Sequence, residues 1–237
     1  MGNACNDCSN DLCLRNVPLF SSLHREAIHT LTSEMEHRRY KKGEVIVHEG
    51  EKASAFTVIR EGSAKAYRIT PDGREQILYI FPVNDYFGAR FLFTEEQVPY
   101  TVEALEPTTV CILSKTNFAN LLAEHSQVAI EIIEAMANRM SRLESAMQSM
   151  GGRNADMRIA SFLLEFRESY GRFNGPFLEI SLPLSREGLA NYLGIARETL
   201  SRKLTQFEEE GIIESVGNRV IRVLDIDRLS NLSFLVD

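Results

Sequence analysis

The spacing of apolar residues divides the chain into two parts with different periods. From about residue 35 to 114, short runs carry β-branched and aromatic residues at alternating positions, as in GEVIVHEG, FTVIREGSAKAYRIT, QILYIF and YTVEAL. Such alternation is typical of strands with one buried face. Turn residues separate the runs at Lys42-Gly43, Glu61-Gly62, Pro71-Asp72-Gly73 and Asn84-Asp85. Closely spaced short strands of this kind predict a β jelly-roll or barrel.

A helical period follows, from about residue 126 to 150. Apolar residues recur there at alternating spacings of three and four, which is the a/d stripe of a heptad repeat: Ile133, Met136, Met140, Leu143, Met147 and Met150. With Ile133 at position a, Arg139 falls at g and Glu144 at the following e, so opposite charges face each other across a parallel pair. We predict a dimer seam; the alternative is one amphipathic helix packed on its own barrel. Methionine specifies packing weakly, so this dimer is expected to be switchable.

A second domain is predicted after Met150-Gly151-Gly152, which ends the helix. Residues 154–170 read as a helix with one apolar face formed by Ile159, Phe162, Leu163 and Phe166. PFLEISLPL then predicts a strand that stops at Pro183. In SREGLANYLGIARETLSRKLTQFEEEG, residues 185–211, two helical patterns meet at Gly194, which can take a left-handed turn, and Ala190 is small enough for close helix approach. This is a helix-turn-helix pattern.

The second helix of this pattern would expose a row of side chains suited to base edges, namely Arg197, Glu198, Ser201, Arg202 and Lys203. Arg202 suits the O6/N7 edge of guanine, and Glu198 can accept from the amino group of cytosine. GIIESVGNRVIRVLD predicts a hairpin that turns at Gly217-Asn218, a wing with Arg219 and Arg222 near phosphates. The alternative is an ordinary helical hairpin with a solvated charged face. Residues 185–205 carry only a small positive excess, so a modest phosphate contribution is expected.

Composition narrows the class of protein. The chain has 237 residues, 44% of them hydrophobic and 25% charged, as in ordinary soluble proteins. No run reaches the ~18 apolar residues of a membrane span, and the polar N-terminus does not read as a secretory signal. We therefore expect a cytoplasmic protein, where thiols are kept reduced. The net charge of −7 argues against nucleic-acid binding only as an average, because a local basic face is still possible.

Three of the four cysteines lie close together in the polar N-terminal segment, at Cys5, Cys8 and Cys13, and the fourth is Cys111. In a cytoplasmic protein, metal binding or redox sensing is a better explanation for such a group than a structural disulfide. The histidines show no pairing in the sequence, and each is expected at the surface: His24, His29, His37, His48 and His125.

The order of barrel, dimer-forming helix and winged helix-turn-helix resembles the CRP/FNR family of bacterial transcription regulators over nearly the whole chain. GEVIVHEGEKASAFTVIREGSAKAYRITPDGREQILYIF resembles the family's barrel, NDYFGARFLF its later turn, and GIARETLSRKLTQFEEEGII its recognition helix. The resemblance implies an α+β fold with a cyclic-nucleotide-binding-like jelly-roll. The expected parts are a cysteine-rich sensor segment (1–18), a barrel (19–125), a dimerisation helix (126–151) and a winged helix-turn-helix domain (152–237).

The resemblance points away from the cyclic-nucleotide branch. Those members carry a G-E-L sequence followed about ten residues later by an Arg-Ser pair, because a buried phosphate diester needs a cation. Here the first part reads Gly88-Ala89-Arg90 and the second Pro99-Tyr100. No cyclic nucleotide is therefore expected.

The oxygen-sensing FNR-like branch accounts for the cysteines. Those members hold an iron–sulfur cluster with three N-terminal cysteines and one from a barrel strand just before a short helix, which is where TTVCILSKTNFANLL places Cys111. The resemblance therefore implies a [4Fe–4S] cluster on Cys5, Cys8, Cys13 and Cys111. The spacing C-x2-C-x4-C is one residue shorter than expected between the last two, which leaves Cys13 the least secure ligand. Zinc on the same thiolates and a reversible disulfide between Cys111 and an N-terminal cysteine remain as alternatives.

The function implied is anaerobic control of transcription. A homodimer would place two recognition helices about 34 Å apart on promoter DNA, with RNA polymerase as a further partner. Glu198-x-x-Ser201-Arg202 matches the family's E-x-x-S-R motif and implies a TTGAT-like half-site. Arg197 instead matches the CRP type, so the resemblance does not specify the outer base of the half-site.

An enzyme is not expected, because His37 and His48 have no matching metal-binding or acid–base partners in the barrel segment.

Overall fold

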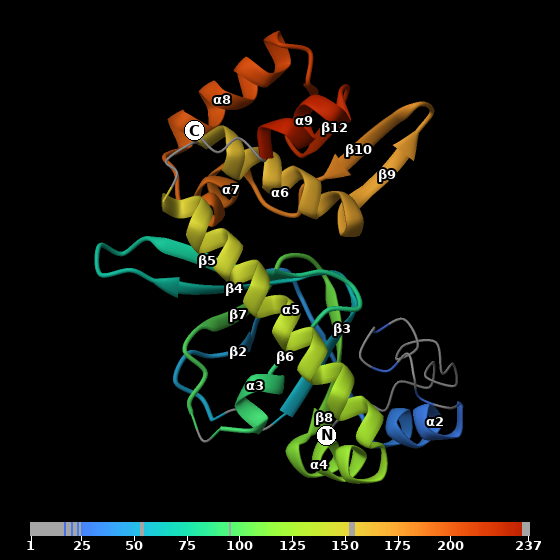
Figure 1. Ribbon diagram of the computed structural model, residues 1–237. Coiled ribbons are helices and arrows are strands. Elements are labelled where there is room, and N and C mark those ends of the chain that lie inside the picture. Colours follow the sequence, from blue (N-terminus) through green and yellow to red (C-terminus); the bar gives the residue numbers. More distant parts are fainter. Residues whose placement is uncertain are drawn as a thin grey trace. The chain divides into compact units, whose positions relative to one another are not determined.

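The computed structural model describes residues 25–52, 55–94, 96–151 and 155–233, together with residues 17, 20 and 23 (Figure 1). The chain divides into two compact units, of which the first holds residues 1–68 and 78–142 and the second holds residues 69–77 and 143–237. Residues 69–77 are described below with the sheet to which their strands belong. Each unit is described by itself below. The predicted ligands Cys5, Cys8 and Cys13 lie outside the described residues.

The first unit is built on two four-stranded antiparallel sheets, ordered β1-β8-β3-β6 and β2-β7-β4-β5. Their strands are β1 (Glu36–Tyr40), β2 (Val45–Val47), β3 (Ala55–Glu61), β4 (Ala64–Ile69), β5 (Glu75–Phe81), β6 (Tyr86–Phe87), β7 (Thr101–Ala104) and β8 (Thr108–Ser114). Inward side chains from both sheets form one buried cluster: Ile59, Ala64, Ala66, Phe81, Phe87, Val102 and Val110. Two sheets packed over a shared apolar core are the predicted jelly-roll.

The turns fall where the sequence placed them. Gly73 has φ 79° and closes the β4–β5 hairpin, in which the amide of Thr70 donates to the carbonyl of Arg74 at 2.8 Å. Gly62 has φ 77°, and a Cβ there would lie 2.5 Å from the carbonyl oxygen of Pro107. Glycine is therefore required at Gly62 both by backbone conformation and by space.

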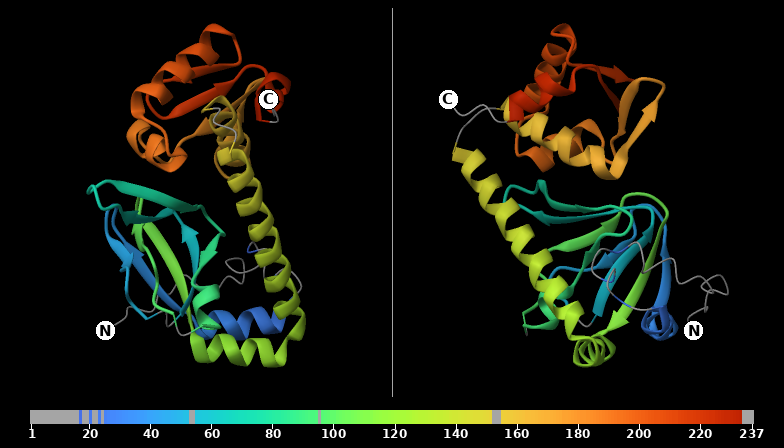
Figure 2. Two further views of the ribbon diagram at one scale, coloured as in Figure 1. Left: turned by 60° about the vertical axis from the view of Figure 1, so that its left-hand side comes forward. Right: turned by 45° about the vertical axis from the view of Figure 1, so that its right-hand side comes forward.

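Helices cover the outer face of the β1-β8-β3-β6 sheet at one end (Figure 2). They are α2 (Arg25–Glu34), α4 (Lys115–Glu124) and the beginning of α5 (Ser126–Gly151); a short α3 spans Ala89–Leu92. The sequence analysis did not predict α2. A second buried cluster joins these helices to the sheet: Val17, Phe20, Ile28, Leu31, Met35, Phe56, Val58, Ala89, Cys111, Leu113, Phe118, Leu121, Val128 and Ile132. The rings of Phe56 and Phe118 stack within it at 5.0 Å.

The second unit packs helices against a small sheet of order β11-β12-β10-β9. Its elements are α6 (Ala155–Tyr170), β9 (Gly171–Asn174), β10 (Phe177–Ser181), α7 (Arg186–Leu193), α8 (Arg197–Glu209), β11 (Ile213–Val216), β12 (Val220–Val223) and α9 (Ile226–Ser233). The predicted apolar face of α6 is buried at Ile159, Phe162, Leu163 and Phe166. The predicted wing is also present, since β11 and β12 pair around Gly217, where φ is 68°.

Candidate nucleic-acid interface

Helices α7 and α8 form the predicted helix-turn-helix. The Ser185 Oγ accepts a hydrogen bond from the Gly188 amide at 3.1 Å and caps the start of α7. Gly194 ends α7 with φ 63° and ψ 35°, a left-handed conformation that redirects the chain into α8. Ala190 is buried at 2% exposure, so the two helices can approach closely there.

Helix α8 presents one apolar face and one polar face. Leu200, Leu204 and Phe207 are buried in the core of the unit. Arg197, Glu198, Ser201 and Arg202 are exposed. The structure therefore brings these four predicted DNA contacts together in one accessible row on one helix.

Lys203 does not belong to that row. Its Nζ lies 2.8 Å from the Asp156 Oδ2 of α6 and 3.1 Å from the Gln206 Oε1. Its side chain is only 23% exposed. The Lys203 ammonium group therefore already has acceptors within the protein, and its contact with DNA stays a prediction.

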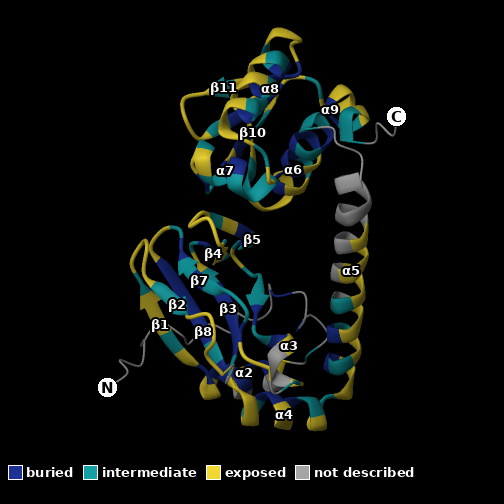
Figure 3. Ribbon diagram, turned by 90° about the vertical axis from the view of Figure 1, so that its left-hand side faces the viewer, coloured by how far each residue is buried: buried dark blue, intermediate teal, exposed yellow. Residues whose placement is uncertain are grey.

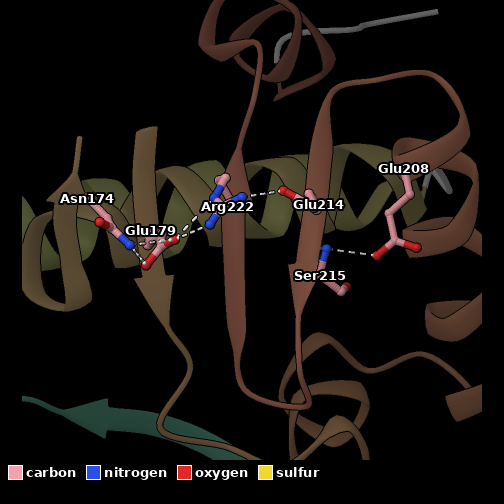
Figure 4. A network of polar contacts seen from close by, with 6 residues as sticks. All are labelled: Asn174, Glu179, Glu208, Glu214, Ser215 and Arg222. Carbon is pink, nitrogen blue, oxygen red and sulfur yellow. Dashed lines mark hydrogen bonds and ion pairs between the residues drawn. The ribbon is translucent and has the colours of Figure 1, made fainter. Parts of the chain in front are cut away.

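The two arginines of the predicted wing have different contacts within the protein. The Arg222 guanidinium lies 2.8 Å from a Glu179 carboxylate oxygen and 2.6 Å from one of Glu214 (Figure 4). It also lies over the ring of Phe177. Asn174 donates to the same Glu179 carboxylate. In this structure two carboxylates hold the charge of Arg222 on the sheet, and its placement near phosphates stays a prediction. Arg219 is exposed and donates to the Pro183 carbonyl at 3.1 Å.

Hydrogen bonds to Ser215 of β11 connect the wing to both α7 and α8, and the sequence analysis did not predict them. The Arg186 Nη2 donates to the Ser215 Oγ at 3.0 Å, and the Glu208 Oε1 accepts from the Ser215 amide at 3.0 Å (Figure 4 shows the second bond). Burial lowers the pKa of Arg186. Arg186 is one of the cations behind the small positive excess of residues 185–205, but in the structure it fastens the start of α7 to β11. No spacing in the sequence indicates such a contact over 29 positions.

The fourth predicted thiol ligand, Cys111, lies on β8 just before α4, as expected. Its side chain is 1% exposed and points to the outer face of the sheet, where it shares the buried cluster with Val17 and Phe20. On the neighbouring strand β1, His37 is its register partner, and His37 Nδ1 lies 3.2 Å from Cys111 Sγ. The expectation of a surface histidine is therefore wrong for His37, which is half-buried. Burial, and then the charge of Arg60, lower its pKa.

Within the part of the chain that the structure describes, no three His, Cys, Asp or Glu side chains gather as a metal site. Cys111 is the described member of the predicted set, and its partners lie outside the described residues. A thiol is the donor that iron–sulfur clusters use, so Cys111 fits that group chemically.

The predicted seam on α5 divides into two faces. Ile133 and Met140 are 65% and 61% exposed, and Ile130 beside them is 48% exposed. Met136 instead is half-buried and packs against the outer-face cluster of the barrel. Exposed positions along α5 are drawn yellow in Figure 3. The side chains of Leu143, Met147 and Met150 lie outside the described residues.

The barrel contains a pocket of about 540 Å³ lined by Tyr40, Phe87, Gly88, Val98, Tyr100 and others. Three carboxylates, of Glu34, Glu36 and Glu51, line it together with Arg38 and Lys52. The Arg38 guanidinium is bound by Glu36 at 2.8 and 3.1 Å. Arg90 forms its own ion pair with Glu96 at 3.0 Å. The charged side chains that line this pocket are thus three carboxylates and two cations.

None of the helices in the described ranges has the length and apolar character needed to span a bilayer.

Comparisons with known proteins match both units. Residues 37–125 fit a family model described as a cyclic nucleotide-binding domain, and residues 157–232 fit a Crp-like helix-turn-helix domain. The transcriptional activator protein FnrA of Stutzerimonas stutzeri is 31% identical over 223 residues, which are 93% of this chain and 88% of that protein. A probable transcriptional regulator, Flp of Lacticaseibacillus casei, is 30% identical over 94% of this chain and 98% of its own length.

Among solved structures, FixK2 from Bradyrhizobium japonicum superposes with a TM-score of 0.75 at 28% identity, covering 86% of this chain and 99% of that one. The two matched ranges cover the barrel and the helix-turn-helix with its wing. The chain therefore belongs to the CRP/FNR family of bacterial transcription regulators and is a DNA-binding protein.

Proposed function

We propose that this regulator controls anaerobic gene expression by sensing oxygen through a [4Fe–4S] cluster held by Cys5, Cys8, Cys13 and Cys111. The observation that carries the proposal is the position of Cys111. Its thiol faces the side of the barrel on which Val17 and Phe20 are buried, and not the barrel interior. Val17 and Phe20, which follow the three N-terminal cysteines in the chain, are therefore anchored on the face where the fourth proposed ligand lies.

The distances along the chain suit this arrangement. Cys13 precedes Val17 by four residues, which span at most about 14 Å when extended. Cys5 and Cys8 precede Cys13 in a polar segment rich in turn residues, and such a sequence can bend around one metal centre. Soft thiolates are the ligands that such clusters use. When bound, the cluster would be the group that reacts with oxygen.

The residues of the chain connect this site to the dimer helix. Val128 and Ile132, near the start of α5, lie in the same buried cluster as Cys111, Val17 and Phe20. Securing the N-terminal segment therefore stabilises the packing at the base of α5. Ile133 and Met140 on the exposed side of that helix would then meet a second copy, and the state of the sensor would bias this association.

The dimer would bind palindromic TTGAT-like sites through Glu198, Ser201 and Arg202, with Arg197 acting on the outer part of the half-site. Relatives named as transcriptional activators, FnrA and Anr, support a role at promoters and hence RNA polymerase as a partner. The charge of the barrel pocket supports a sensor other than a cyclic nucleotide.

Anaerobic purification followed by iron and acid-labile sulfide analysis tests the proposal. We expect about four iron and four sulfide per chain, with an absorption band that bleaches in air. Cys111→Ser should lose the iron, whereas His125→Ser, an exchange outside the proposed ligands, should retain it. A wild-type protein without iron would overturn the cluster.

A second sensor chemistry is compatible with the same position of Cys111. A disulfide between Cys111 and one N-terminal cysteine would secure the same segment on the same face. In that case the protein would contain no iron, and thiol titration after mild oxidation would show two thiols lost per chain. Mass mapping would identify the pair.

A further inference from the structure

The first turn of α6 contacts both helices of the helix-turn-helix. The Asp156 Oδ2 lies 2.8 Å from Lys203 Nζ on α8. Two residues later, the Arg158 Nη1 donates to the carbonyl of Leu193 at the end of α7, at 3.3 Å. Both contacts lie within the second unit.

The Asp156–Lys203 pair is largely shielded from water. The two side chains are 16% and 23% exposed. Ion pairs in such positions are less screened than surface pairs, so their geometry is held more firmly. Lys203 also contacts Gln206 at 3.1 Å, and Gln206 donates to Glu210 at 2.8 Å, so the contact extends along α8.

Lys203 lies on the flank of α8 between its buried and exposed faces. Its neighbours in sequence are the exposed Arg202 and the buried Leu204. Successive residues of a helix are about 100° apart, since a turn has 3.6 residues. Fixing the Lys203 flank therefore fixes the direction in which Glu198, Ser201 and Arg202 point.

We propose that Asp156 and Lys203 form a positioning pair that sets the rotation of the recognition helix α8 and thereby the specificity of DNA reading. Lys203 acts through Asp156 and not through a DNA phosphate. Packing of Leu200, Leu204 and Phe207 holds α8 on the core, and the ion pair adds a directional contact that apolar packing lacks.

The test measures DNA affinity of the full-length protein, purified anaerobically, on two duplexes. One duplex is selected by the wild-type protein from random sequence, and the other is a scrambled control. Lys203→Met, Asp156→Asn and the exchanged double variant D156K/K203D are compared over a salt series. Arg167→Met and Glu168→Gln, exposed positions on the same helix α6, provide controls with matched changes in charge.

We expect each single variant to lose roughly tenfold in affinity for the selected duplex. Affinity for the scrambled duplex and the salt slope should stay at the values of the charge-matched controls. The exchanged double variant should recover most of the affinity for the selected duplex, and Lys203→Arg should retain it. Circular dichroism and thermal melting identify any variant that has not folded. If Lys203→Met does not fold, Asp156→Asn carries the test, because only a positioning role predicts a loss of affinity from it.

Other results would overturn the proposal. If Lys203 contacts a phosphate, Lys203→Met lowers both affinities and reduces the salt slope by about 1, while Asp156→Asn weakens neither. If folded single variants bind both duplexes like the controls, the pair has no positioning role. Because the duplex is selected by the protein itself, neither result depends on the sensor or the half-site proposed above.

Discussion

His37 Nδ1 lies 3.2 Å from Cys111 Sγ, across the adjacent strands β1 and β8. The contact joins the proposed fourth ligand to a strand that the sequence analysis did not connect with the sensor. It also determines which substitution at Cys111 is informative. A serine hydroxyl can bond to the imidazole as the thiol does, whereas alanine cannot.

Cys111→Ala should lower the free energy of unfolding by about 1 kcal/mol, because it removes a buried sulfur and its contact with His37. Cys111→Ser should keep the hydrogen bond but place a hydroxyl in an apolar cluster. Chemical denaturation of the iron-free protein measures both. A Cys111→Ala protein as stable as wild type would show that the sulfur contributes nothing to the barrel core.

Ile133→Glu should weaken the dimer without unfolding the chain, since Ile133 is 65% exposed on α5. Asn138→Glu adds the same charge at the f position of the predicted heptad, which faces away from a seam, and serves as the control. Sedimentation velocity at several concentrations gives the result. Equal effects of the two variants would place the dimer contact elsewhere.

Arg202→Ala should weaken binding to the preferred site by about 1–3 kcal/mol and relax the preference for guanine at one position. Binding titrations with each base at that position, at fixed salt, measure the effect. A uniform loss on all duplexes, with a smaller salt slope, would instead identify Arg202 as a phosphate contact.

Gly194→Ala should destabilise the second unit by about 1 kcal/mol, because Gly194 has φ 63°. Gly194→Asn should lose less, since asparagine tolerates this conformation better. Thermal melting of the two variants beside wild type makes the comparison. Equal stability of the alanine variant would show that the turn can adopt another backbone conformation.

The wing sheet should respond to acid through Glu179. Hydrogen bonds from Arg222, and then from Asn174, lower the pKa of Glu179 below its ordinary value of 4.5. Its ionised form therefore stabilises the folded state above about pH 4.5, and this contribution is lost as the pH falls through the lowered pKa. Denaturation between pH 3 and 7 should show that Glu179→Gln is less stable than wild type near neutrality and that the difference narrows in acid. Glu168→Gln, at an exposed position, should show no such narrowing.

The elements with a clear period were predictable from sequence. The alternating strands, the turns at Gly62 and Gly73, the apolar face of α6 and the left-handed Gly194 all depend on local chemistry, and the structure has them as predicted. Helix α2 was not predicted, because the residues that it buries, Ile28 and Leu31, gain their partners only in the folded unit.

The residues of the candidate site were predictable from sequence only where their role depends on lying on an exposed helix face. Arg197, Glu198, Ser201 and Arg202 lie on the polar face of an amphipathic helix, and periodicity alone identifies that face. The roles of Lys203, Arg222 and His37 depend on partners between 43 and 74 positions away in the chain. A basic side chain reads the same in sequence whether it meets a phosphate or a carboxylate.

Contacts within the protein hold three cations of the second unit, Arg186, Lys203 and Arg222, and this affects how strongly the regulator binds DNA without a target site. These cations are held by Ser215, Asp156, Glu179 and Glu214, and the whole chain carries a net charge of −7. Sequence-independent attachment to DNA grows with the number of phosphates that a protein neutralises. We therefore expect this protein to spend little time on non-target DNA, so that occupancy of a promoter depends chiefly on the match between its operator and the exposed row on α8.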